Sequence, residues 1–65
     1  MTKAQEIMEK HIIDTLSHKQ LFFSEIKELL DRVPLENVSL LKIIEILVDK
    51  SWYLTAAYLA KEYDL

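Results

Sequence analysis

The amino-acid sequence predicts an all-α fold, a small bundle of three to four short helices. Apolar residues recur at helical spacing along the chain, with charged residues on the other sides of the same segments. Gly is absent, so the tight primed turns that close many β-hairpins lack their usual residue. Cys is absent too, and Pro34 is the only Pro, which leaves neither a disulfide framework nor a Pro-rich linker. We expect one helical domain over residues 1–65.

The first helix is expected over residues 2–19, because an apolar stripe follows one side of this segment at spacings of three and four residues. On the solvent side, Glu6 and Lys10 have the i,i+4 spacing of a favourable ion pair. The apolar stripe consists of Ala4, Ile7, Met8, Ile12 and Leu16.

The second helix is expected over residues 24–33. Ser24 is the expected N-cap, since its hydroxyl can accept a hydrogen bond from an amide of the first turn. Pro34 disfavours helical geometry at Val33 and so marks the end. Glu28 and Arg32 have the spacing of an exposed pair. The apolar face consists of Phe22, Phe23, Ile26, Leu29, Leu30 and Val33.

The third helix is expected over residues 37–50, with Asn37 or Ser39 as its cap. Its apolar residues cover an arc of roughly 220°, whereas about 100° suffices for one core-facing side. Two interpretations stay open: the helix lies at the centre of its own bundle, or another molecule covers its second side. For the second interpretation, the expected interface residues are Leu41, Ile44 and Val48.

The last helix is expected over residues 51–63, with Ser51 as its cap and an inward stripe that leaves Leu54, Tyr58 and Leu65 outside it. The alternative is an extended segment "WYLT" followed by a short helix, since aromatic residues and Thr tolerate extension. Tyr and Trp are enriched at protein interfaces, so three more interface residues are expected here: Trp52, Tyr53 and Tyr58. The inward stripe consists of Trp52, Ala56, Leu59, Ala60 and Tyr63.

The charge pattern argues against a nucleic-acid or membrane partner. The net charge is −3, and basic residues alternate with acidic ones instead of forming a patch. The first residues lack the pattern of a signal peptide, and no run of about 18 apolar residues occurs. We therefore expect a cytoplasmic protein with no membrane contact.

No catalytic, cofactor-binding or metal-ligating site is expected. The segment "DTLSH" contains Asp14, Ser17 and His18, but on a helix Ser17 and His18 point about 100° apart, and no Gly-bearing turn presents a nucleophile. We expect Asp14 and His18 to form an ordinary i,i+4 pair. His11 and His18 would lie roughly 10 Å apart along a helix, too far to share one ion. The sequence therefore predicts that the chain is not an enzyme.

The favoured hypothesis is a small acidic protein-interaction module, a regulator, adaptor or inhibitor that acts through an apolar helix face. A homodimer is the expected assembly, and a different protein is the second expected partner. A 65-residue domain without disulfides is marginal in stability, and a partner subunit is a common support.

A second hypothesis comes from the order of "IIDTL", "FFSEIKELL" and "VSLLKIIEILVDKSWYL", which resembles the three-helix part of winged-helix domains over residues 7–54. The resemblance implies a helix-turn-helix transcriptional regulator whose third helix contacts DNA. Such a helix reads bases with Arg, Lys, Asn or Gln, whereas this one offers Lys42 beside Glu45 and Asp49. The alternative is therefore a helix-turn-helix-type regulator with weak or lost DNA contact.

Overall fold

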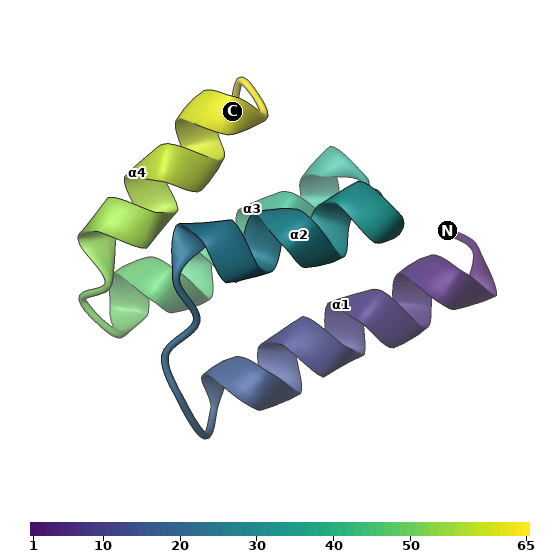
Figure 1. Cartoon of the computed structure of the whole chain (residues 1–65), viewed down its shortest axis with the longest axis horizontal. Coiled ribbons are helices and arrows are strands. Elements are labelled where there is room, and N and C mark those ends of the chain that lie inside the picture. The colour runs from purple at the N-terminus through teal and green to yellow at the C-terminus, as the bar shows by residue number, and fades with distance from the viewer.

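Four α-helices joined by short connections make up the computed structural model, which describes all residues from Met1 to Leu65 (Figure 1). The helices are α1 (Lys3–Leu16), α2 (Phe23–Arg32), α3 (Asn37–Asp49) and α4 (Tyr53–Glu62). No strand is present. The predicted all-α fold with a small bundle of helices is confirmed.

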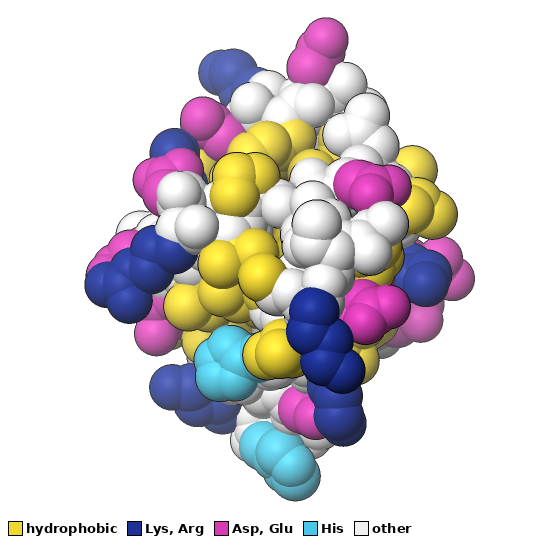
Figure 2. Space-filling view, turned by 90° about the vertical axis from the view of Figure 1, so that its right-hand side faces the viewer, with side chains coloured by type: hydrophobic (Ala, Val, Ile, Leu, Met, Phe, Trp, Pro, Cys, Tyr) yellow, Lys and Arg dark blue, Asp and Glu magenta, His cyan; other side chains and the backbone are white.

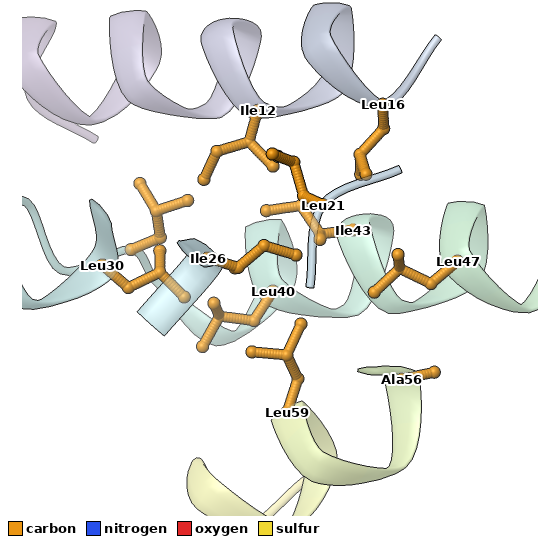
Figure 3. Packing of buried hydrophobic residues seen from close by; sticks show 11 residues of the cluster. Ile12, Leu16, Leu21, Ile26, Leu30, Leu40, Ile43, Leu47, Ala56 and Leu59 are labelled. Carbon is orange, nitrogen blue, oxygen red and sulfur yellow. The ribbon is translucent and has the colours of Figure 1, made fainter. Parts of the chain in front are cut away.

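Helix α3 lies between α1 and α4, and α2 packs against α4. Figure 3 shows Ile12 and Leu16 of α1 pointing toward Ile43 of α3, while Leu59 approaches from α4 on the other side. The core therefore has α3 at its centre. Its eleven buried hydrophobic residues are Ile12, Leu16, Leu21, Ile26, Leu30, Leu35, Leu40, Ile43, Leu47, Ala56 and Leu59.

Helix α1 starts one residue after the predicted start and ends three residues before the predicted end. Thr2 is the N-cap: its Oγ1 accepts from the Gln5 amide at 3.2 Å, and Gln5 Oε1 accepts from the Thr2 amide at 2.8 Å. Gln5 also donates from Nε2 to the carbonyl of Pro34 at 3.0 Å, which ties α1 to the connection between α2 and α3. The helix ends at Leu16, and the predicted extension to residue 19 forms a turn.

The predicted caps of the other three helices are wrong. Helix α2 begins at Phe23, with Phe22 and not Ser24 at the N-cap position. The Phe22 amide donates to Glu25 Oε1 at 3.0 Å. Helix α3 has Glu36 at its N-cap position, with no side-chain hydrogen bond, while Ser39 is buried inside the first turn. Burial of Leu35 and Leu40 on either side of this start fixes the boundary more strongly than a cap does.

Ser51 ends α3 instead of starting α4. Its φ of 64° is left-handed, and its amide donates to the Val48 carbonyl while the Trp52 amide donates to the Leu47 carbonyl, both at 2.9 Å. This pair of bonds is the Schellman motif, in which Gly usually holds the left-handed position. Helix α4 then begins at Tyr53, so the extended interpretation of "WYLT" is wrong for Tyr53, Leu54 and Thr55.

Candidate protein interface

The outer side of α3 carries an apolar surface, which we call the α3 patch: Leu41, Ile44 and Val48. Leu41 is 53% exposed and Val48 is 45% exposed, whereas Ile44 is half-buried and packs against the core. The three residues follow one line of the helix because they are three and four positions apart. Ile44 is therefore partly used inside the molecule, and the assignment of the three residues to an interface stays a prediction.

The wide apolar arc of α3 is mostly used within the chain. Leu40, Ile43 and Leu47 are buried, since α1 covers one side of the helix and α4 the other. What is left outside is the α3 patch together with exposed Val38. The interpretation that the helix lies at the centre of its own bundle therefore holds for most of the apolar arc. Only the exposed remainder is left for another molecule to cover.

Charged residues lie along one edge of the α3 patch. Lys42, Glu45 and Asp49 are all exposed. Lys42 Nζ lies 4.0 Å from Glu9 Oε1 of α1, the limit of an ion pair. The edge thus has a basic residue in its N-terminal half and acidic residues in its C-terminal half.

The three aromatic interface residues predicted on the last segment do not join the α3 patch. They lie around a second surface, the α2–α4 groove, formed where the N-terminal ends of α2 and α4 meet. It consists of two adjoining depressions of about 280 and 390 Å³ that share Phe22, Leu54 and Thr55. Trp52 and Tyr53 line the first depression, and Tyr58 lines the second.

Phe22 and Leu54, two exposed apolar residues of the α2–α4 groove, were not among the predicted interface residues. Phe22 is 58% exposed and Leu54 is 75% exposed. Phe22 was expected on the inner face of its helix, but it precedes the first turn, where the helical period does not apply. The position of Leu54 outside the inward stripe was the available signal. Phe23 forms one wall with Tyr58, their ring centroids 5.5 Å apart at an interplanar angle of 45°, which is within the range of favourable aromatic pairs.

Polar contacts between α2 and α4 continue beyond the groove. Lys27 Nζ donates to Asp31 Oδ1 at 3.0 Å and lies 3.8 Å from Glu62 Oε2. The hydrogen bond to Asp31 is the main reason that the pKa of Lys27 is raised. Burial raises the pKa of Tyr63, against the opposing effect of Lys27, and the Tyr63 hydroxyl has no hydrogen-bond partner. Of these contacts, the Lys27–Glu62 pair is the one that joins α2 to α4.

The surface as a whole carries charges of both signs. On the end of the molecule that faces right in Figure 1, Lys and Arg side chains alternate with Asp and Glu side chains around exposed hydrophobic ones (Figure 2). The exposed pair Glu28–Arg32 forms as expected, with 3.2 Å between Oε1 and NH2. No large region of one sign is visible on this face.

The residues of "DTLSH" form local contacts only. Asp14 pairs with Lys10 at 2.9 Å, so neither the expected Asp14–His18 pair nor the Glu6–Lys10 pair is among the ion pairs. His18 lies beyond the end of α1, which explains the difference. Ser17 Oγ donates to the Asp14 carbonyl at 2.6 Å. No group of three or more His, Cys, Asp or Glu residues has the arrangement of a metal site.

Comparisons with protein-family models, curated proteins and solved structures find no match to this chain. None of the four helices has both the length and the apolar character that crossing a membrane requires.

Proposed function

We propose that this chain is a protein-interaction module that forms a homodimer through the α3 patch. The observation that carries the proposal is the exposure of Leu41 and Val48 on a helix whose opposite side is the centre of the core. The core holds α3 firmly, so its outer side offers a preformed surface and little ordering cost accompanies binding.

The charges beside the patch favour an antiparallel arrangement of two copies. In that arrangement Leu41 packs against Val48 of the second copy, and Ile44 lies close to the two-fold axis. Lys42 then lies opposite Glu45 and Asp49 of the second copy, and the same contacts recur on the other side of the axis. In a parallel arrangement the charged edges of the two copies would instead lie on opposite sides of the interface, so these ion pairs would not form.

The burial available predicts a weak dimer. About half of each Leu41 and Val48 side chain is left to bury, which contributes on the order of 1 kcal/mol per side chain. Four such side chains per dimer, with Ile44 adding less, must also offset the loss of translational and rotational freedom. The gross contribution of about 4 to 5 kcal/mol, reduced by that cost, predicts a dissociation constant of about 1 mM or weaker.

Light scattering over a dilution series tests this proposal. The mass should rise from 7.7 kDa toward twice that value with concentration. Leu41→Glu should keep the protein monomeric while the far-ultraviolet circular dichroism stays helical, because Leu41 lies outside the core. Leu54→Glu is the matched control on the other surface and should dimerise normally. A monomer at every concentration, or a Leu41→Glu dimer as strong as the original, would show that the α3 patch is not the interface.

A charge exchange tests the antiparallel geometry separately. Lys42→Glu should weaken the dimer because it brings acidic residues together, and adding Asp49→Lys should restore much of the affinity. If the double variant is as weak as the single one, the two residues do not meet across the interface.

The helix-turn-helix alternative has less support. The exposed charged residues of α3 are Lys42, Glu45 and Asp49, and acidic groups oppose contact with phosphates. Binding to random duplex DNA that weakens as the salt concentration rises would revive this alternative.

A further inference from the structure

We propose that the α2–α4 groove binds an amphipathic helix of another protein, one that presents apolar side chains flanked by Asp or Glu. This inference rests on the proposed function in assigning protein binding to the chain. It concerns a different surface, because no residue is shared between the groove and the α3 patch.

The first argument is the amount of apolar surface in one place. Leu54, Phe22 and Tyr58 are among the most exposed large side chains of the molecule, the last at 54%. Phe22 and Leu54 line both depressions and so connect them, and Tyr58 lines the second. Isolated exposed apolar residues are common on soluble proteins, whereas a contiguous concave cluster indicates a binding surface.

The second argument is the electrostatic character of the groove. Both α2 and α4 begin there, and the amides of Phe23, Ser24, Tyr53 and Leu54 have no backbone acceptor. The first turn of α4 contains no acidic residue, whereas the first turn of α2 contains Glu25, whose carboxylate accepts from the Phe22 amide and offsets part of that positive end. The positive end of α4 therefore lies beside the apolar surface with no acidic residue in its first turn, which favours carboxylates in the ligand.

Lysine residues extend this positive character. Lys50 Nζ lies 5.5 Å from the ring centroid of Trp52, which lines the first depression. Lys61 is exposed and follows Leu54 and Tyr58 along the same line of α4, seven and three positions later. A ligand lying along α4 would thus pass from apolar contacts to a basic residue.

The ligand should be a helix and not an extended strand. The chain has no β-strand, so an extended peptide would find no sheet edge to which its backbone could pair. Leu54, Tyr58 and Lys61 have the i, i+4, i+7 spacing that packs against the ridges of a second helix.

Two synthetic amphipathic peptides of about 18 residues test the inference. Both carry Leu at i, i+4 and i+7, and both lack Trp and Tyr; one has Glu on the flanking positions and the other has Lys. Binding to the full chain is measured by the emission of Trp52, the single Trp, and by calorimetry. The Glu peptide should bind at least about tenfold more tightly than the Lys peptide, and the difference should shrink as the salt concentration rises.

Three variants locate the site. Leu54→Glu should weaken binding of the Glu peptide at least about tenfold, and Lys61→Glu should reduce its advantage over the Lys peptide. Leu41→Glu should leave binding unchanged even if it abolishes the dimer, so failure of the groove and failure of the dimer are separate results. Equal binding of both peptides, no binding by either, or full binding by Leu54→Glu would overturn the proposal.

Discussion

Replacing Ser51 by Gly should stabilise the protein. Ser51 holds the left-handed position of the turn between α3 and α4 at φ 64°, where a side chain brings Cβ close to the following carbonyl. This turn sets the direction of α4, and with it the groove. The substitution therefore tests whether a chain without any Gly carries backbone strain at a structural junction.

The expected gain follows from two opposing effects. A non-Gly residue in the left-handed region costs about 1 to 2 kcal/mol, while Gly increases the conformational entropy of the unfolded chain, which costs about 0.5 to 1 kcal/mol. The net gain is on the order of 0.5 to 1 kcal/mol. For a domain of this size, such a gain raises the midpoint of thermal unfolding by roughly 2 to 8 °C.

Thermal unfolding followed by circular dichroism measures this gain. Ser24→Gly is the matched control, since Ser24 is exposed on α2 and adding Gly within a helix should lower the midpoint. Ser51→Ala should give no gain, because Ala keeps the Cβ. If Ser51→Gly lowers the midpoint as Ser24→Gly does, the left-handed turn stores no strain and the reasoning is wrong.

Two further substitutions probe buried polar groups. Ser39 is fully buried and its hydroxyl has no hydrogen-bond partner. Ser39→Ala should therefore raise the free energy of unfolding by about 1 kcal/mol, measured as a higher urea midpoint at an unchanged m value. A lower midpoint would mean that the hydroxyl is satisfied. The pKa of Tyr63 is raised from 10.0, so its stabilising contribution is complete below pH 10 and is lost as the pH rises through the folded value. Tyr63→Phe should therefore lose less stability than the original protein in alkaline urea titrations, and an identical alkaline loss would contradict this.

The fold class and the approximate helix positions could be predicted from sequence because they depend on periodicity. Ile12 and Leu16 of the predicted α1 stripe and the inner side of α3 are buried as their spacing requires. The N-terminal part of that stripe is not buried, since Ala4 is exposed and Ile7 is 59% exposed. The caps could not be predicted because several residues near each boundary are good caps. Ser24 and Ser51 have that chemistry, but the packing of Ile26 and Leu47 decides where the helices begin and end.

The candidate surfaces depend on contacts between helices, and the apolar periodicity of a single helix carries no information about those contacts. The sequence placed Leu41 and Val48 outside the core correctly, but Ile44 lies beside another part of the bundle and is half-buried. The α2–α4 groove joins Phe22 to Leu54, residues separated in the sequence by two whole helices, α2 and α3, and two connections. Only the arrangement of α2 against α4 brings them together.

The position of α3 links the two proposed surfaces. A core of eleven hydrophobic residues is small, so a helix at its centre must supply apolar side chains to α1 and α4 at once. That requirement gives α3 its wide apolar arc, and the part that neither neighbour covers becomes the α3 patch. The turn at Ser51 then directs α4 across α2, leaving Leu54 outside and opening the groove. A dimer through the first surface would present two copies of the second, so a partner with two acidic amphipathic helices would bind more tightly than either contact alone allows.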